Sequence, residues 1–280
     1  MTQLTAAIGP VEIGGPRLVL IAGPCVAESL DLCLEIAEQV SQLCRRLGIG
    51  YVFKASFDKA NRSSAAGYRG PGLDTGLGYL HTVRSACNVP VLSDIHEAAQ
   101  ADEAAAVLDA VQIPAFLCRQ TDLLVAAGKT GKCVNIKKGQ FMAPWDMRQA
   151  VAKVRSTGNQ HVLLTERGSS FGYNRLVVDM TGVPVMKAFA PVVFDATHST
   201  QQPGAMDGEA SGGSPRHAPI LAAAALAAGA DALFIETHPK PELAKSDAAT
   251  MLPLDRMEAL LTQCLAVFQA VRPGHAPRPF

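Results

Sequence analysis

The sequence predicts an α/β protein, a closed (β/α)8 TIM barrel with a short N-terminal hairpin. Three observations predict it: eight short β-branched runs alternate with helical segments, the runs are nearly continuously apolar, and no break in composition divides the 280 residues. Such strands are typical of a parallel sheet covered by helices, and eight units favour a closed barrel in one domain, residues 1–280. A doubly wound open sheet is the alternative, because strand counts from one sequence are fallible.

The predicted core strands share a short apolar run, and helical spacing separates them. The strands are residues 18–22, 51–54, 91–93, 110–113, 134–137, 162–165, 192–194 and 232–236. The clearest helical faces are formed by Leu32, Ile36, Val40 and Leu43 and by Leu254, Met257, Leu260 and Leu261. Together these elements account for most of the chain as repeated strand and helix units.

Three segments do not fit the repeat. Residues 1–16 contain I-G-P and I-G-G-P, which suggest a hairpin that plugs the barrel floor. Residues 199–215 are rich in Gly, Ser, Gln and Pro, and we interpret them as a long loop that serves as a mobile lid, with disorder as the alternative. Residues 272–280 carry three prolines and are expected to form an extended or flexible tail.

Composition excludes some partners. Lysine plus arginine equals aspartate plus glutamate, 25 each, so no global charge draws the chain to nucleic acid or a membrane. The apolar run at residues 220–228 is far shorter than the ~20 residues of a membrane span. The N-terminal residues lack a basic start followed by a long apolar core, so we expect no secretory signal. Seven scattered cysteines without a CxxC pair fit a reduced, cytoplasmic compartment.

Chemically versatile side chains follow the predicted strands, at the end where (β/α)8 barrels build their sites. They are Cys25, Lys54, Asp94, Gln112, Lys137, Arg167, His198 and Glu236. Any single buried lysine among them is as readily explained by a structural ion pair. Eight groups able to bind an anion, carry a proton or hold a metal at one rim instead indicate a functional site.

The densest basic cluster runs from Lys54 to Arg69 and includes K-A-S-F-D-K-A-N-R-S-S. Arginine offers a fork that matches phosphate oxygens, lysine a point charge and serine further donors. A solvated basic loop is the alternative, weakened because the cluster begins where a buried strand ends. Lys137, Lys138 and Arg167 add cations at two further strand ends. We therefore expect two phosphates, or a phosphate and a carboxylate.

A second candidate group consists of Cys25, His198, Glu236 and Asp247. Thiolate, imidazole and carboxylate ligands suit a borderline divalent ion such as Zn²⁺, Fe²⁺, Mn²⁺ or Co²⁺. Their separations match no short metal motif, and Cys25 alone is more simply explained as a small packed hydrophobe. Their places after the first, seventh and eighth strands, which are neighbours in a closed barrel, favour a metal site. Both interpretations stay open on these grounds.

Dense motifs cover nearly the whole chain. They are I-A-G-P-C-V-A-E-S at 21–29, Y-V-F-K-A-S-F-D-K-A-N-R-S-S at 51–64, Y-R-G-P-G-L at 68–73, S-D-I-H-E at 93–97, Q-I-P-A-F-L-C-R-Q-T-D-L at 112–123, N-I-K-K at 135–138, R-G-S-S-F-G-Y at 167–173, F-D-A-T-H at 194–198, A-S-G-G at 210–213 and F-I-E-T-H-P at 234–239. In these motifs the sequence resembles the 3-deoxy-D-manno-octulosonate 8-phosphate (KDO 8-phosphate) synthase family. The K-A-N-R-S-S element is the most specific, since the sister enzymes making the seven-carbon shikimate precursor carry a K-P-R-T-like element there.

The resemblance implies condensation of phosphoenolpyruvate with D-arabinose 5-phosphate and water, which releases phosphate and forms the eight-carbon sugar acid of bacterial lipopolysaccharide. The residues implied for phosphoenolpyruvate are Lys54, Lys59, Gln112, Lys137 and Arg167. Those implied for the pentose and its phosphate are Asn61, Arg62 and Ser63. The resemblance also implies a homotetramer in which Arg119 of the partner subunit reaches the same phosphate. Asp94, at a strand end, is a further substrate-binding candidate.

The family divides into metal-dependent and metal-independent branches, and the sequence is similar to the first. The independent branch has asparagine where this chain has Cys25, and typically reads C-D-G where this chain has S-D-A at residues 246–248. The resemblance thus implies a divalent metal held by Cys25, His198, Glu236 and Asp247. The catalytic candidates are His198, Asp247, Lys54 and Cys25.

Two other functions remain as alternatives. The sister seven-carbon synthase uses erythrose 4-phosphate in place of the pentose phosphate, and an assay of substrate choice separates the two. A non-catalytic sugar-phosphate-binding barrel needs anion-binding residues, but it has no use for the cysteine, histidine and carboxylate set.

Overall fold

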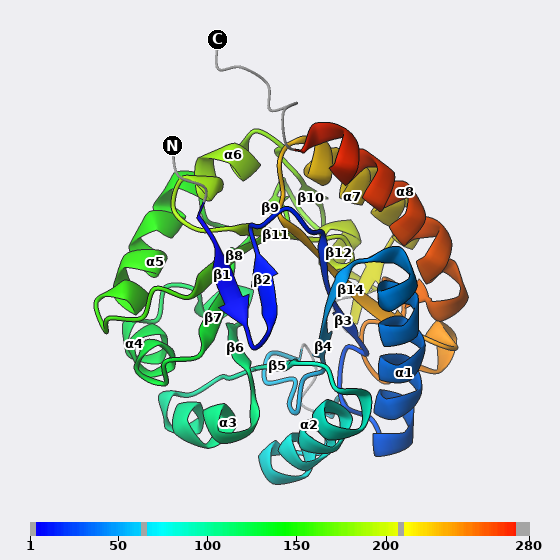
Figure 1. The fold of residues 1–280 in the computed structure, drawn as a ribbon, viewed down its shortest axis with the longest axis horizontal. Coiled ribbons are helices and arrows are strands. Elements are labelled where there is room, and N and C mark those ends of the chain that lie inside the picture. Colours follow the sequence, from blue (N-terminus) through cyan, green and yellow to red (C-terminus); the bar gives the residue numbers. More distant parts are fainter. Residues whose placement is uncertain (1–3, 63–65, 207–209, 273–280) are drawn as a thin grey trace.

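The computed structural model describes residues 4–62, 66–206 and 210–272, and within them a ring of helices surrounds a ring of strands (Figure 1). The barrel strands of these residues are β3 (Val19–Gly23), β4 (Gly50–Lys54), β5 (Val91–Asp94), β6 (Ala110–Ile113), β7 (Cys133–Lys137), β8 (Val162–Glu166), β11 (Val192–Asp195) and β14 (Ala232–His238). Each strand pairs in parallel with the next, and β14 pairs with both β11 and β3, which closes the sheet. The predicted (β/α)8 barrel is confirmed, and the open sheet is excluded.

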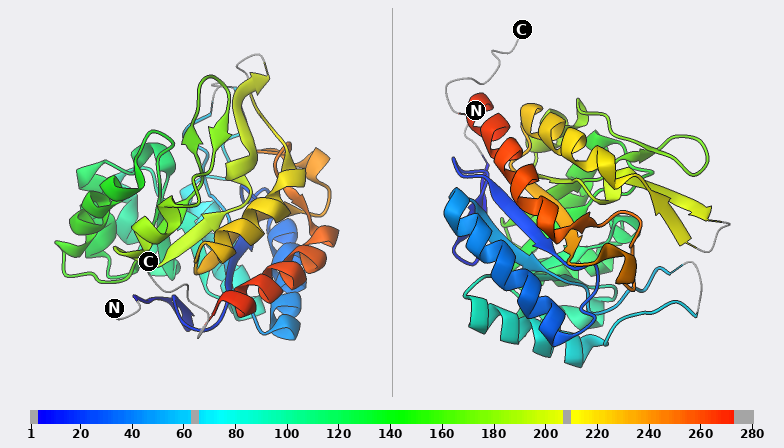
Figure 2. Two further views of the ribbon diagram at one scale, coloured as in Figure 1. Left: turned by 90° about the horizontal axis from the view of Figure 1, so that it is seen from above. Right: turned by 90° about the vertical axis from the view of Figure 1, so that its right-hand side faces the viewer.

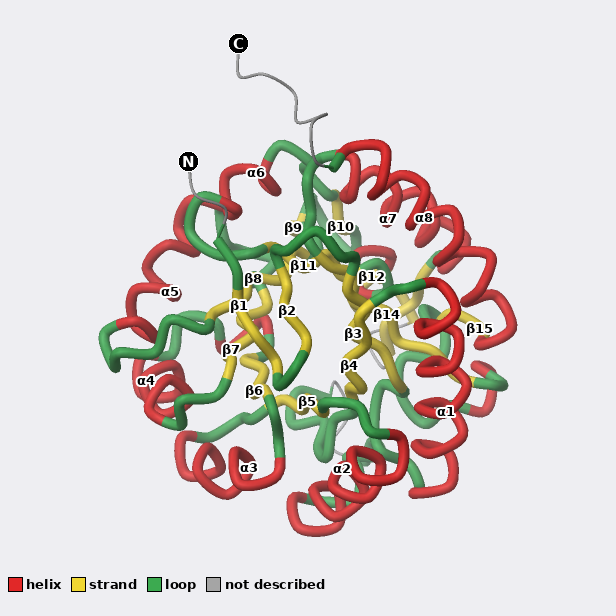
Figure 3. Tube along the Cα trace, in the orientation of Figure 1, coloured by secondary structure: helices red, strands yellow, loops and turns green. Residues whose placement is uncertain are grey.

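The helices cover the outside of the barrel (Figure 3). They are α1 (Leu30–Leu47), α2 (Leu73–Cys87), α3 (Ala101–Val107), α4 (Thr121–Lys129), α5 (Met147–Arg155), α6 (Gly182–Lys187), α7 (Ala218–Ala227) and α8 (Met257–Val271). In α1 the Ser29 hydroxyl accepts a hydrogen bond from the Leu32 amide at 3.2 Å, and Gly48 ends the helix with a φ of 69°. Ile36 and Val40 of its predicted apolar face are buried in the core.

The inner surface of the barrel changes character along its axis. Alternate residues of a strand face the same side of the sheet, so every second residue of each barrel strand points inward. In β7, Cys133 packs in the apolar cluster at one end, whereas Lys137 lines a cavity at the other. The amino ends of the strands therefore form an apolar floor, and the carboxyl ends form a polar rim.

An antiparallel hairpin of β1 (Ala6–Ile8) and β2 (Val11–Ile13) covers the floor, as Figure 1 shows from below. Gly9 provides the left-handed conformation of its turn, with a φ of 53°. The side chains of Ile8 and Ile13 are completely buried among the inward residues of the barrel strands. The hairpin and its place at the barrel floor were both expected from the sequence, and both are confirmed.

Two ribbons extend from the opposite end of the barrel (Figure 2). The first pairs β9 (Ser169–Ser170) with β10 (Leu176–Val177), and the second pairs β12 (Gln201–Met206) with β13 (Ala210–Gly213). A short strand, β15 (Leu252–Pro253), pairs with the end of β14. Residues 199–215, predicted as a long loop, therefore contain a two-stranded ribbon, and their role as a lid stays a prediction. Main-chain hydrogen bonds alone join an antiparallel pair, so a sequence poor in apolar residues still forms one.

The C-terminal helix is fastened to the floor by Arg272. Its guanidinium donates to the Gly15 carbonyl at 2.8 Å, pairs with the buried Asp231 carboxylate and lies 4.7 Å from the ring centre of Phe268. The predicted flexible tail began at this residue, but Arg272 itself is held. The rest of that segment lies outside the described residues.

Two further observations concern the environment of the chain. No helix in the described ranges has the length and apolar character needed to cross a bilayer. All seven cysteines are unpaired and buried. The thiols thus pack as small apolar groups, apart from Cys25, which lies beside the cavity described next.

Candidate active site

A cavity of about 610 Å³ opens at the carboxyl ends of the barrel strands. The predicted site residues that line it are Lys54, Lys59, Asn61, Arg62, Asp94, Gln112, Lys137, Arg167, His198, Glu236 and Asp247. The structure therefore brings together side chains that lie nearly 200 positions apart in the sequence. A space of this size accommodates small-molecule ligands.

Three predicted site residues are not among those that line the cavity. Cys25 is completely buried just beneath it and contacts Asp247. Arg119 is exposed before α4, and the Lys153 ammonium donates to its carbonyl at 2.8 Å. Its place outside the cavity is compatible with the expected reach into another subunit, which stays a prediction. Ser63 lies outside the described residues.

The wall built by β6, β7 and β8 presents hydrogen-bond donors to the cavity. Lys137 pairs with the buried Asp195 carboxylate, and its ammonium lies 3.3 Å from the ring centre of Phe234. Burial lowers the pKa of Lys137 to about 8, although Asp195 opposes the shift. One terminal nitrogen of Arg167 donates to Gln201 at 2.7 Å, and the other has no hydrogen-bond partner among the described residues. This wall is suited to bind an anion.

The neighbouring Lys138 does not belong to this wall, contrary to the sequence prediction that it adds a cation to the site. It is completely buried, with its ammonium 3.1 Å from the Gly168 carbonyl, 3.1 Å from the Ser169 hydroxyl and 3.5 Å from the Glu166 carboxylate. Successive strand residues face opposite sides of the sheet, so Lys137 enters the barrel and Lys138 leaves it. Lys138 ties the loop after β7 to the loop after β8.

Lys54 occupies the bottom of the cavity. Its ammonium lies 3.2 Å from Glu236 Oε1, 2.9 Å from the Ser56 hydroxyl and 3.2 Å from the Cys25 carbonyl. Lys59 also lines the cavity. Burial lowers its pKa, but the Cys25 and Glu236 groups outweigh burial and raise the pKa well above the usual value. Lys59 is thus available as a cation at neutral pH.

The K-A-N-R element lies at the rim. Asn61 is exposed, whereas Arg62 is half-buried and donates to the Tyr68 carbonyl at 2.9 Å and to the Lys245 carbonyl at 3.0 Å. Arg62 thereby connects the long loop after β4 to the loop after β14. These contacts fix a guanidinium over the mouth of the cavity, where it can meet an anionic group of a bound molecule.

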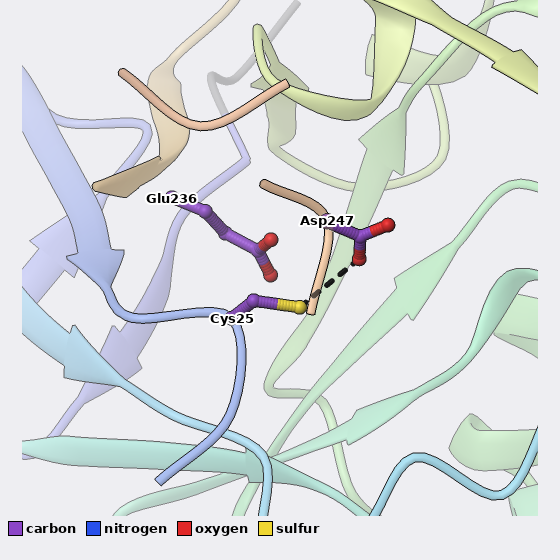
Figure 4. Close-up of side chains that lie close together, drawn as sticks. All are labelled: Cys25, Glu236 and Asp247. Atoms are coloured by element: carbon purple, nitrogen blue, oxygen red, sulfur yellow. Dashed lines mark hydrogen bonds between the residues drawn. The ribbon is translucent and has the colours of Figure 1, made fainter. Parts of the chain in front are cut away.

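Opposite the donor wall lies a group of metal-ligand type. Cys25, Glu236 and Asp247 each offer one ligand atom, and these atoms lie within 4.8 Å of one another. They come from the loop after β3, the end of β14 and the loop that follows it, and they point toward one another (Figure 4). The Cys25 thiol donates to Asp247 Oδ2 at 3.0 Å. His198 borders the group, with Nε2 3.3 Å from Glu236 Oε2 and 3.7 Å from Asp247 Oδ2.

The charges in this corner indicate a place for a cation. Burial and the Asp247 and Glu236 carboxylates raise the pKa of the Cys25 thiol to about 11. Burial lowers the pKa of His198, but the Asp195 and Glu236 carboxylates outweigh it and raise that pKa well above its usual value. Glu236 Oε2 is buried and accepts no hydrogen bond from the described residues. This sulfur, nitrogen and oxygen set fits a borderline divalent ion.

Sequence reasoning missed three side chains of the site. Asp195 Oδ2 lies 2.7 Å from His198 Nδ1 and also contacts Lys137. Gln201 joins the two walls, because it accepts from Arg167 and donates to Asp247 Oδ1 at 3.1 Å. His96 lines the cavity with Nε2 3.0 Å from Asp94 Oδ2. The signal for Asp195 and His96 was a polar residue at or just after a strand end, within F-D-A-T-H and S-D-I-H-E. For Gln201 there was none.

Comparison with known proteins gives one consistent result. The model of the DAHP synthetase I family matches residues 3–272. The 2-dehydro-3-deoxyphosphooctonate aldolase of Koribacter versatilis is 58% identical over 268 residues, 95% of this chain and 96% of its own. The enzyme of the same name from Syntrophotalea carbinolica is 55% identical over 270 residues, 96% and 97% of the two chains. That from Desulfotalea psychrophila is 56% identical over 258 residues, 92% of each chain.

Proposed function

The chain belongs to the DAHP synthetase I family, and from this premise we propose that it is a KDO 8-phosphate synthase. It condenses phosphoenolpyruvate with D-arabinose 5-phosphate and water, giving 3-deoxy-D-manno-octulosonate 8-phosphate and inorganic phosphate for lipopolysaccharide biosynthesis. The observation that carries the proposal is one cavity in which the K-A-N-R element, the donor wall and the Cys25 group converge. Full-length similarity to the 2-dehydro-3-deoxyphosphooctonate aldolases supports the eight-carbon product.

Phosphoenolpyruvate is assigned to the deep part of the cavity. Lys137, Arg167 and the Gln112 amide face the same space from three adjacent strands, and Lys54 and Lys59 approach from the other side. The negative charges of a phosphate and a carboxylate together would balance the positive charges of these side chains. Holding this charge in a fixed pose beside a second anion is mainly a contribution of proximity and electrostatics.

The pentose phosphate is assigned to the rim. Asn61 and Arg62 stand there beside the exposed mouth, and Ser63 is the third predicted member of the element. Asp94 supplies an acceptor for a sugar hydroxyl, and the pKa of its carboxyl is held far below the usual value, with Lys54 and His96 overcoming the opposite effect of burial. This arrangement would direct the aldehyde end of the sugar inward.

The reaction forms one carbon–carbon bond and one carbon–oxygen bond, and it breaks another carbon–oxygen bond. C3 of phosphoenolpyruvate attacks the pentose aldehyde, water adds at C2, and the resulting hemiketal phosphate loses inorganic phosphate by C–O cleavage. His198 holds one proton on Nδ1 against Asp195, which directs Nε2 toward Glu236 and Asp247. Asp247 is the group that would move a proton in this corner. Lys54 stabilises negative charge that develops on the aldehyde oxygen.

Cys25, His198, Glu236 and Asp247 would hold a divalent metal ion, of Zn, Fe, Mn or Co type. When bound, such an ion supplies Lewis-acid chemistry, which polarises a carbonyl or lowers the pKa of a water molecule. The buried Glu236 oxygen without a hydrogen bond and the mixed donor set support this assignment. Asp195 orients His198 through Nδ1, as the outer partner of a metal-binding histidine commonly does.

We further propose that the chain works as a cytoplasmic homotetramer. Exposed aromatic side chains gather on the loops that follow β6, β7 and β8, namely Phe116, Phe141, Trp145, Phe171 and Tyr173. Three adjacent loops with exposed aromatic residues are suited to bury one another between subunits. Arg119 lies next to the first of these loops, so a partner seated there would bring Arg119 of the partner subunit near a cavity mouth. Seven unpaired cysteines support a reducing compartment.

The test uses the purified full chain with phosphoenolpyruvate and either D-arabinose 5-phosphate or erythrose 4-phosphate. We expect phosphate release with the pentose to exceed that with the tetrose by about tenfold or more in kcat/KM. Faster release with erythrose 4-phosphate would instead support the seven-carbon synthase. Binding of the sugar phosphate without any turnover would support a sensor.

A further inference from the structure

Three polar side chains form a hydrogen-bonded row inside the barrel, below the cavity. The Thr165 hydroxyl of β8 donates to Asn135 Oδ1 of β7 at 2.6 Å, and Asn135 Nδ2 donates to Gln112 Oε1 of β6 at 3.0 Å. Thr165 and Asn135 are completely buried, and Gln112 is 4% exposed. The row therefore crosses three adjacent strands and reaches the cavity only through Gln112.

The row separates the charged rim from the apolar floor. Asn135 lies two residues before Lys137 on β7, and Thr165 two residues before Arg167 at the end of β8, so each lies directly below a cation of the donor wall. Two residues further down the same strands are Cys133 and Leu163, which pack in the floor cluster. The row is thus the layer on which the anion-binding layer rests.

Packing alone does not require this row. A buried amide or hydroxyl costs free energy unless it is hydrogen-bonded, and a set of well-packed apolar side chains of similar volume is about equally stable. Branched aliphatic residues usually fill this position in (β/α)8 barrels. Three hydrogen-bonded polar side chains on adjacent strands at this position therefore indicate a requirement other than stability.

The row fixes which end of the Gln112 amide faces the cavity. A hydroxyl donor at Thr165 occupies Asn135 Oδ1, and Asn135 then presents its nitrogen to Gln112. Gln112 Oε1 is therefore used as an acceptor within the barrel wall. Its amide nitrogen has no hydrogen-bond partner within the described part of the chain, and Gln112 lines the cavity. The N–H₂ group is left to donate to a bound molecule.

We propose that Asn135 and Thr165 are positioning residues that hold Gln112 as a hydrogen-bond donor to the anion bound between Lys137 and Arg167. This inference rests on the proposed function, in which that anion is phosphoenolpyruvate. Without the row the buried Gln112 oxygen has no donor, so the amide is expected to turn until this oxygen reaches the cavity, where a carbonyl rather than an N–H₂ group then faces the anion. The row thus acts on affinity for one substrate and leaves the other substrate alone.

A double-mutant cycle tests the proposal on the full-length enzyme. The dissociation constant of phosphoenolpyruvate is measured by titration calorimetry for the wild type, Asn135→Leu, Gln112→Ala and the double variant. We expect Asn135→Leu to weaken binding about tenfold in the wild-type background, the worth of one hydrogen bond to a charged acceptor, and less than twofold in the Gln112→Ala background. The same loss in both backgrounds, or no loss in either, would overturn the proposal.

Thr165 offers a second route that does not depend on the folding of the leucine variant. Thr165→Val removes the hydroxyl at constant shape, and Thr165→Ser keeps it. We expect Thr165→Val to raise the KM for phosphoenolpyruvate severalfold, with little change in kcat or in the KM for the pentose phosphate, and Thr165→Ser to restore it. Equal rises in both KM values, or failure of serine to restore the first, would contradict the positioning role.

The positioning role of the row and the proposed function are contradicted by different results. If the wild-type enzyme binds phosphoenolpyruvate but releases no phosphate with the pentose, the proposed function is wrong, and the binding cycle still decides the role of the row. If turnover is normal and the cycle is additive, the row is structural and the proposed function stands.

Discussion

The two walls of the cavity differ in the kind of group they present. The wall from β6, β7 and β8 presents donors, with Gln112, Lys137 and Arg167 facing the space. The wall from β14 and the loop that follows it presents the carboxylates of Glu236 and Asp247, and the Cys25 thiol lies just beneath them. A cavity of uniform charge would hold only an anion or only a cation. The difference is what the proposed function requires, a site for an anion beside a site for a metal ion.

Two side chains connect the walls by contacting residues of both. Asp195 contacts Lys137 on one side and His198 on the other, and Gln201 contacts Arg167 and Asp247. Each connection places an acceptor toward a cation of the donor wall. Damage to one wall should therefore alter one ligand strongly, whereas damage to a connection should alter both.

Removal of the metal should have the largest effect and should act on one wall only. Dialysis against a chelator is expected to lower turnover on the order of 1,000-fold, because Lewis-acid chemistry supplies several kcal/mol, and added Mn²⁺ or Zn²⁺ should restore it. Elemental analysis checks the metal content in parallel. Cys25→Ala should lose the metal, whereas Cys33→Ala, a buried thiol on α1, should keep it. Full activity in chelator would rule out a metal-dependent enzyme.

The donor wall is broken by Arg167→Met. We expect the KM for phosphoenolpyruvate to rise about 100-fold, because charge-assisted hydrogen bonds to an anion are lost, while the KM for the pentose phosphate changes little. Steady-state kinetics with each substrate varied in turn measures both. Arg62→Met is the reciprocal variant and should raise the KM for the pentose phosphate instead. A rise of both constants in either variant would contradict the division between depth and rim.

The smallest expected effect is a pH dependence of the donor wall. Because burial lowers the pKa of Lys137 to about 8, the ammonium is charged below that pH and neutral above it. The kcat/KM for phosphoenolpyruvate should therefore fall with rising pH above about 8, by up to tenfold per pH unit.

Asp195→Asn sharpens the same test. Asp195 raises the pKa of Lys137, so loss of its charge should shift the alkaline fall to lower pH. A pH profile of kcat/KM for wild type and variant provides the comparison. An alkaline limb that does not move between the two would remove Lys137 as its cause.

Much of the site could be predicted because parallel strands bring their carboxyl ends to one rim. Once eight strands were identified, Lys54, Asp94, Gln112 and Glu236 followed from their positions after apolar runs. It was harder to predict which of two adjacent residues faces the cavity. Lys137 and Lys138 have the same chemistry, and only the register of β7 decides that the first enters the cavity and the second leaves it. An error of one residue in a strand reverses this assignment.

Other parts depend on contacts that no local pattern encodes. Asp247 lies on a loop with a φ of 50° at that residue, and its approach to Cys25 follows from the tertiary fold. Gln201 belongs to a segment predicted as a long, lid-like loop, so its role between the walls could not be anticipated. Asp195 was visible as a strand-end carboxylate, but two cations compete for it, and sequence alone does not rank them.

The hairpin across the barrel floor has a consequence for how substrates enter and how the product leaves. Ile8 and Ile13 fill the amino end of the barrel, so the cavity has its mouth at the ribbon end. Phosphoenolpyruvate is assigned to the deep part of the cavity and the pentose phosphate to the rim. A bound pentose phosphate would therefore block the entry of phosphoenolpyruvate. Substrates must then bind in a fixed order, phosphoenolpyruvate first. The eight-carbon product has to leave through the same opening by which both substrates entered.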